Sequence, residues 1–300
     1  MSTAEATAVP HAGGAGPADQ LAHRPGAAAA WLRLLRSELR LVFRRLRNLA
    51  LLAALAALPI LLGIALRLAA PRGGGGPESS FVDQLAGNGV FLAFIAITIM
   101  IALVLPLAIA VISGDSMAGE ANLGTLRYLL TVPAGRTRLL AVKYASIVIF
   151  GLSACFVVVA AALATGAALF PIGPVTLLSG NTVSLGQGLL RVLFVTLYVA
   201  AAMAALGAIG LAISTFTEHP IGAIAAILVL AVVSEIADNI PQFAVVQPYL
   251  PTHWWLFFDS LLRTPIATSD LLHGLLSFGV YAVIFCAIAW ARFTGADVTA

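Results

Sequence analysis

The sequence predicts an all-α polytopic membrane protein with six transmembrane helices. Hydrophobic residues make up 61% of the chain and charged residues 10%, whereas an ordinary soluble domain carries about 25% charged residues. A helix needs about 20 residues to cross a hydrocarbon core of roughly 30 Å. Six apolar runs approach or exceed that length, at residues 48–68, 90–112, 139–162, 188–213, 221–237 and 271–290. They predict a six-helix membrane domain over residues 48–292.

The basic residues predict the orientation of this domain, because Lys and Arg are retained on the cytoplasmic side of short loops. With the N-terminus inside, 12 of the 16 basic residues lie on the cytoplasmic side: seven Arg before the first span, four between Arg127 and Lys143, and Arg292. Both termini are therefore expected in the cytoplasm of a multi-pass protein of the cell (inner or plasma) membrane. The net charge of +3 reflects this topology and indicates no nucleic-acid surface.

Two short tails are expected outside the membrane domain. Residues 1–26 are rich in Ala, Gly, Pro and His without apolar periodicity, which predicts a disordered cytoplasmic tail. They also lack the basic start and apolar core of a secretory signal. Residues 293–300 are predicted to be a cytoplasmic C-terminal tail.

Residues 27–47 predict an amphipathic helix in the cytoplasmic headgroup layer. Its basic and apolar residues occupy opposite helical faces: Arg33, Arg36, Arg40, Arg44 and Arg47 against Trp31, Leu35, Leu39, Val42 and Leu46. Glu38 and Arg45 break this pattern, since they lie within or beside the apolar arc. They either meet a partner surface there or extend their charged groups to water, and the pattern favours neither reading.

Proline and small residues predict features within the spans. Pro59 and Pro106 each remove a backbone hydrogen bond and are expected to kink the first and second spans. The fourth span carries a small-residue face that suits close helix packing, at Ala202, Ala205, Gly207 and Gly210.

The polar segment from Gly114 to Arg136, between the second and third spans, predicts a short amphipathic helix. Apolar and polar side chains separate on its helical wheel: Leu123, Leu126 and Leu130 against Glu120, Gly124, Arg127 and Thr131. On the cytoplasmic side, such a helix can rest its apolar face on the bundle. Its polar face is then expected to meet a cytoplasmic partner.

Two further segments hold candidate functional residues. The second cytoplasmic turn offers Thr217 and Glu218 to a partner. Glu235 and Asp238, one helical turn apart at the end of the fifth span, either line an outer vestibule or lie in water at the interface.

The segment from Asp238 to Asp270 is rich in proline and aromatic residues. Amphipathic aromatics concentrate at the membrane interface. We therefore expect short re-entrant helices that dip into the outer leaflet, or a simple interfacial anchor.

Several classes of function lack support in the sequence. The glycine run at residues 73–76 is no P-loop, since that motif needs Gly-Lys-Ser/Thr and the only lysine is Lys143. The chain is therefore not expected to hydrolyse ATP. No His or Cys spacing marks a metal site. An ion-coupled secondary transporter would show inverted repeats with interrupted helices. An intramembrane enzyme would need converging polar groups on facing spans. The sequence shows neither pattern, and both classes are kept as alternatives.

Two motifs resemble the permease subunit of a type-2 ATP-binding-cassette exporter. The stronger is Glu120-x-x-x-Gly124-Thr125-Leu126-Arg127-x-Leu129-Leu130-x-x-Pro133-x-x-Arg136. The second, residues 34–40, is similar to the family's basic elbow helix before the first span. The resemblance covers residues 28–292 and makes residues 48–292 a permease domain.

This resemblance implies a half-transporter in which two permease subunits, as a homodimer or heterodimer, form the pathway and separate ATPase subunits bind ATP and Mg. Residues 114–136 are then the coupling helix. Glu120 and Arg127 would donate or accept charge-assisted hydrogen bonds, Gly124 would permit close backbone approach and Pro133 would end the helix. Thr125 and Arg136 complete the motif. The implied activity is export of a lipid-like, drug-like or peptide substrate, with no single substrate indicated.

Overall fold

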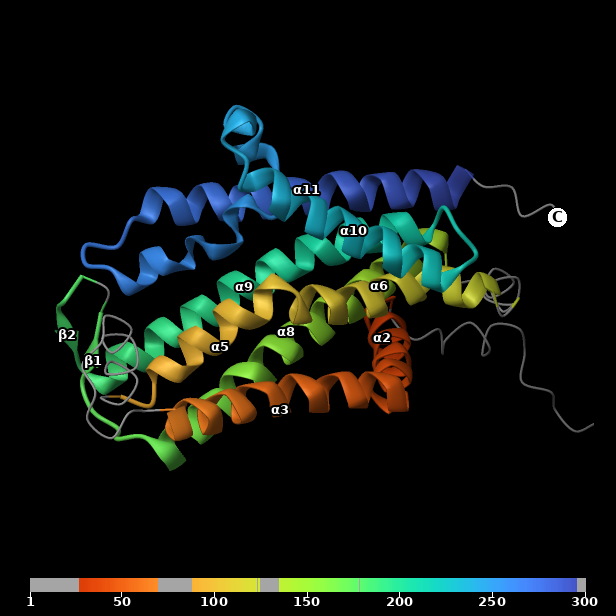
Figure 1. Cartoon of the computed structure of the whole chain (residues 1–300). Coiled ribbons are helices and arrows are strands. Elements are labelled where there is room, and N and C mark those ends of the chain that lie inside the picture. Colours follow the sequence, from red (N-terminus) through yellow and green to blue (C-terminus); the bar gives the residue numbers. More distant parts are fainter. Residues whose placement is uncertain (1–26, 70–87, 123, 125–134, 178, 296–300) are drawn as a thin grey trace, which may run out of the picture.

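The chain folds into a bundle of long helices in the computed structural model, which describes residues 27–69, 88–122, 124, 135–177 and 179–295 (Figure 1). The α-helices are α2 Ala27–Arg44, α3 Leu46–Ala69, α5 Phe91–Ala102, α6 Val104–Asn122, α8 Arg136–Leu169, α9 Leu185–Ser214, α10 Pro220–Asp238 and α11 Thr268–Gly295. Three 3₁₀ helices join α10 to α11: η1 Pro241–Phe243, η2 Gln247–Tyr249 and η3 His253–Leu262.

The prediction of six membrane-spanning helices is confirmed. Six described helices are long and apolar enough to cross a bilayer: α3, α6, α8, α9, α10 and α11. The longest, α8, has 34 residues and spans about 50 Å at 1.5 Å per residue. It runs the length of the bundle in Figure 1.

The outer helices of the bundle carry large apolar side chains on their surface. Leu68 of α3 is 81% exposed, Ile221 of α10 is 83% exposed and Val283 of α11 is 70% exposed. Such extensive apolar surface is unfavourable in water but suits hydrocarbon. The exposed faces and the length of the helices together indicate a multi-pass membrane protein.

Helix α9 forms the centre of the bundle, and the small-residue face predicted for it is confirmed. Ala202 and Ala205 are buried. A Cβ atom on Gly210 would lie 2.0 Å from Ser113 Oγ of α6, and one on Gly207 would lie 2.6 Å from Ile147 Cγ2 of α8. The absence of side chains at these positions allows α6 and α8 to approach α9 closely.

The second span is interrupted, which its single apolar run did not show. Leu103, at φ −147° and ψ −46°, separates α5 from α6. Pro106 lies in the first turn of α6 and has no N–H to donate to the carbonyl of Ala102, so the helical ladder stops there. Helix α3, by contrast, continues through Pro59.

The predicted start of the short helix at Gly114 is wrong. Residues 114–122 continue α6, because Gly114 permits close packing on α10 instead of ending the helix: a Cβ there would lie 2.9 Å from the side chain of Ile224. Residues 125–134 of that predicted helix lie outside the described residues.

A small hairpin, not predicted from the sequence, joins α8 to α9. Strands β1 Val175–Thr176 and β2 Thr182–Val183 pair in antiparallel register. Near it, Gly89 crosses Gly166 of α8 so closely that a Cβ on Gly166 would lie 2.1 Å from the carbonyl oxygen of Gly89. This contact fixes the start of α5 against the end of α8.

Substituting Gly166→Ala should destabilise the protein, because the added methyl group meets backbone atoms that cannot move aside independently. We expect a clear fall in the apparent melting temperature of the detergent-purified protein. Gly279→Ala on α11 is the matched control, since nothing lies within 4 Å of a Cβ built there. Equal melting temperatures for the two variants would contradict the crossing.

Candidate functional site

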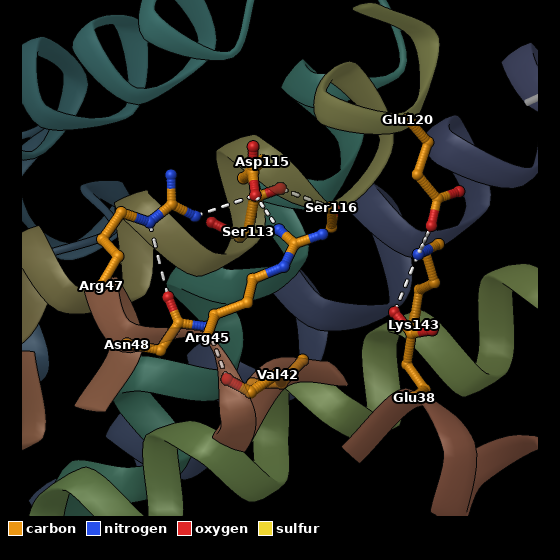
Figure 2. A network of polar contacts seen from close by, with 10 residues as sticks. All are labelled: Glu38, Val42, Arg45, Arg47, Asn48, Ser113, Asp115, Ser116, Glu120 and Lys143. Atoms are coloured by element: carbon orange, nitrogen blue, oxygen red, sulfur yellow. Dashed lines mark hydrogen bonds and ion pairs between the residues drawn. The ribbon is translucent and has the colours of Figure 1, made fainter. Parts of the chain in front are cut away.

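Lys143 lies where three helices meet. Its side chain on α8 is 2% exposed, and its Nζ atom lies 2.8 Å from Glu38 Oε1 of α2 and 2.5 Å from Glu120 Oε1 of α6. Figure 2 shows the ammonium group between the two carboxylates. One cation therefore joins α2, α6 and α8.

The apolar face of α2 brings Glu38 to this point. Leu35, one turn before Glu38, is buried. Further along the helix, Phe43 packs against Phe150 of α8, with 5.8 Å between the centres of the two rings. Because these contacts turn one side of α2 toward α8, Glu38 points at Lys143 and not at water.

The burial of this ion triad makes each partner important for stability. A buried charge is costly unless opposite charges and hydrogen bonds compensate for the lost hydration. The carboxylates of Glu38 and Glu120 are themselves largely covered, at 17% and 18% exposed. Without the ammonium group of Lys143, two carboxylates would face each other in a poorly hydrated space.

A second set of ion pairs joins the start of α3 to α6. Asp115 Oδ2 accepts hydrogen bonds from Arg45 Nη1 at 2.5 Å and from Arg47 Nη2 at 2.8 Å. Asp115 is only 13% exposed, whereas both arginines are about half exposed. Figure 2 shows both guanidinium groups directed at the Asp115 carboxylate, and their greater exposure indicates that they cover it from solvent.

The bend between α2 and α3 at Arg45 places these arginines. Asn48, which is buried, donates from Nδ2 to the carbonyl oxygen of Val42 at 2.8 Å. This bond satisfies a carbonyl near the end of α2 that has lost its helical partner. Arg45 and Arg47 then project together toward Asp115. The structure thus ends α2 at Arg44, three residues before the boundary predicted at residue 47.

We refer to these side chains as the junction network, comprising Glu38, Arg45, Arg47, Asn48, Asp115, Glu120 and Lys143. Its three cations balance its three carboxylates. A cavity of about 40 Å³ lies among them, which is large enough for ordered water. The network therefore presents no net charge to the surrounding apolar side chains.

The predicted coupling residues are only partly described. Glu120 belongs to the junction network. Gly124 adopts a left-handed φ of +66° just past the end of α6, and its N–H donates to the carbonyl oxygen of Ala121 at 3.0 Å. This is the conformation in which glycine commonly ends a helix. Thr125, Arg127 and Pro133 lie outside the described residues.

Arg136, the last residue of the predicted coupling motif, begins α8 and contacts the last helix. Its Nη1 donates to the carbonyl oxygen of Thr294 at 3.0 Å. Next to it, Thr137 accepts a hydrogen bond from the indole of Trp290 at 2.9 Å. The start of α8 is therefore joined to the end of α11, at the same end of the bundle as α2 (Figure 1).

The turn with Thr217 and Glu218 lies near that end too. Glu218 is exposed, and Thr217 Oγ1 accepts from the N–H of His219 at 3.1 Å. Phe216 lies beneath the guanidinium of Arg292 of α11, 5.6 Å from the ring centre. The structure therefore places these candidates at the same end as α2 but outside the junction network.

Glu235 and Asp238 lie at the other end of α10, away from the junction network. Asp238 Oδ1 pairs with His253 Nδ1 of η3 at 2.5 Å, and its carbonyl oxygen accepts from Gln247 at 2.6 Å. Ser234 and Thr252 share a buried hydrogen bond of 2.7 Å beside them. These contacts attach the 3₁₀ segment to the end of α10.

Sequence reasoning did not assign Asp115, Arg47, Asn48 or Lys143 to a site. For Asp115, the available signal was a carboxylate directly after the apolar run of the second span, five residues before Glu120. A single lysine inside the third span was the signal for Lys143. Charges are rare within spans and are usually paired, so both invited a search for partners. Lys143 pairs with Glu38 of α2 and Glu120 of α6, and Asp115 pairs with Arg45 and Arg47 at the bend between α2 and α3, so only the fold identifies the partners that are distant in sequence.

One comparison with known proteins identifies a family for this fold. The family model described as ABC-2 family transporter protein matches residues 33–298, from the second turn of α2 to beyond the end of α11. No curated protein matches the chain significantly.

Replacing Lys143 by Met should destabilise the protein by about 3–5 kcal/mol, because two covered carboxylates lose their common partner. The measurement is the apparent melting temperature of the purified protein in mild detergent. The triple variant Glu38→Gln, Glu120→Gln, Lys143→Met should recover much of this loss, since it buries no charge.

The control for that experiment is Asp259→Asn. It breaks an exposed pair with Arg263, 2.9 Å long, and exposed pairs contribute about 0–1 kcal/mol. A Lys143→Met variant as stable as Asp259→Asn would show that the buried triad does not hold the helices together.

Proposed function

Because the chain belongs to the ABC-2 transporter family, we propose that it is the membrane-spanning subunit of an exporter driven by separate ATPase subunits. The family match supports the role of a permease component and a partnership with an ATP-binding subunit. Outward transport, a pathway between two permease subunits and binding of ATP and Mg by the partner are parts of the proposal. The proposed substrate is lipid-like, drug-like or a peptide.

The observation that carries the proposal is the position of the junction network. Glu120 is bound to Lys143. It lies three residues before residue 123, where the segment 123–134 begins, and of that segment the structure describes only Gly124. Lys143 in turn binds Glu38. Any force on the segment that follows α6 therefore reaches α2, α6 and α8 together. A coupling element needs such a rigid attachment if nucleotide-driven movement is to reach the membrane helices.

The remaining candidate residues receive roles consistent with this arrangement. We propose that α2 is the elbow helix, that Glu38 and Arg45 join it to the bundle, and that residues 123–134 contact the ATPase with Thr125, Arg127 and Pro133. Thr217 and Glu218 provide a second contact from the turn before α10. The η1–η3 segment is proposed to be re-entrant, attached to α10 through Asp238, with Glu235 facing an outer vestibule.

The interrupted second span is also a feature of secondary transporters, in which broken helices coordinate ions near the membrane centre. The residues around this interruption are apolar, from Ala102 to Pro106. They offer no side-chain ligand for an ion. The missing N–H of Pro106 accounts for the interruption without an ion.

Gly124→Trp should uncouple the ATPase while leaving the permease in the membrane, because bulk at this position blocks close approach. In detergent extracts of native membranes, we expect the tagged variant to retain at least about tenfold less ATPase than the wild type, the loss expected when a central contact is removed. The ATPase is identified as the P-loop protein that co-purifies with the wild-type chain.

Gly124→Asn is the matched control, since asparagine tolerates the left-handed conformation better than other residues with a side chain. It should retain most of the ATPase. If Gly124→Trp retains as much ATPase as Gly124→Asn, this glycine does not face the partner.

The orientation has its own test. The variant Thr125→Cys should react with a membrane-impermeant maleimide in inside-out vesicles and remain unlabelled in intact cells. The native cysteines serve as a background control, because Cys155 is buried and Cys286 is partly buried. Labelling at position 125 from outside the cell would reject the proposed coupling role.

A further inference from the structure

Helix α2 carries a basic face that no described carboxylate neutralises. Arg33, Arg36, Arg40 and Arg44 follow one another at intervals of three or four residues and are all exposed. Together with Ser37, Leu41 and Arg45 they line an open groove. Among the residues that the structure describes, no Asp or Glu forms an ion pair with any of these four arginines. We call these four residues the arginine face.

The rest of α2 fixes the direction of this face. Leu35 is buried, Phe43 packs against α8 and Glu38 is bound to Lys143. On a helix with 100° per residue, the arginine face lies nearly opposite Leu35 and Glu38. The four guanidinium groups therefore point away from the bundle.

The position of α2 places the arginine face near the membrane surface. Figure 1 shows α2 lying across the long helices, with α6 and α11 reaching further toward the same end of the molecule. A helix perpendicular to membrane-spanning helices lies parallel to the bilayer plane. On either side of the arginine face, Leu32 is 59% exposed and Leu41 is 58% exposed. Apolar side chains beside basic ones suit the boundary between headgroups and acyl chains.

Four guanidinium groups on one helix face, none paired with a carboxylate in the part of the chain that the structure describes, repel one another. Anions at this surface relieve the repulsion, and guanidinium groups bind phosphate oxygens through paired hydrogen bonds. We infer that the arginine face binds the phosphate groups of anionic phospholipids in the cytoplasmic leaflet. The inference rests on the proposed function only for placing α2 at the cytoplasmic surface.

The test compares phosphatidylglycerol with phosphatidylcholine on the full-length protein. Native mass spectrometry of the purified chain counts retained lipids, and melting temperatures with each added lipid provide a second readout. We expect the wild type to retain and be stabilised by phosphatidylglycerol but not by phosphatidylcholine. Inorganic phosphate should not replace the lipid. Because each basic residue near an anionic surface adds to the attraction, replacing all four arginines by glutamine should weaken phosphatidylglycerol binding by at least about tenfold.

Two controls define the comparison. Arg263→Gln removes an exposed arginine that lies five residues before the start of α11, and it should leave phosphatidylglycerol binding unchanged. Changing the four arginines to lysine keeps the charge without the forked hydrogen bonds, so binding should fall only in part. The glutamine variant keeps the buried face of α2, and its melting temperature without anionic lipid should match that of the wild type.

The inference is overturned if the four-glutamine variant retains phosphatidylglycerol as well as the wild type does. It is also overturned if that variant keeps the lipid but loses the co-purifying ATPase, since the arginine face would then be a protein-binding surface. Loss of lipid with normal ATPase retention supports the inference. If the wild-type chain co-purifies with no ATPase, that result counts against the proposed function. The lipid measurements still test the inference independently.

Discussion

One buried ammonium group determines how this end of the bundle is assembled. Lys143 is almost fully covered, and a lysine in that position is stable only if carboxylates reach it. They come from α2 and from α6, two helices far apart in the sequence. The dependence is mutual, because Glu38 and Glu120 are covered as well. The three helices therefore have to meet at this point for any of the three charges to be tolerated.

The surface properties of α2 follow from the same contact. Once Glu38 is held by Lys143 and Phe43 lies on Phe150, the remaining side of the helix faces outward with its arginines. The bend at Arg45 then sends Arg45 and Arg47 back to Asp115, which attaches α6 a second time. The attachment of α6 and the outward exposure of the arginine face are thus two results of one packing arrangement.

Sequence patterns predicted the elements that depend on local composition, and they missed those that depend on distant contacts. The six spans follow from apolar length, and the α9 packing face follows from the spacing of Ala202, Ala205, Gly207 and Gly210. The continuation of α6 through Gly114 could not be predicted, because that glycine serves packing on Ile224. The pairs of Lys143 with Glu38 and of Asp115 with Arg45 and Arg47 were equally hidden, since 68 to 105 residues separate their members in the sequence. The charges were visible, but the helices that would neutralise them were not.

The interruption at Leu103 divides the second span into halves with different neighbours. Its first helix, α5, is held where Gly89 crosses Gly166, and its second helix, α6, is held where Glu120 meets Lys143. Both anchor points lie on α8, which is one unbroken helix of 34 residues. The second span therefore consists of two helices that join at Leu103, and each is attached at its far end to the continuous helix α8. A tilt of α6 relative to α5 would therefore require a change of backbone angles near Leu103, between the two attachment points.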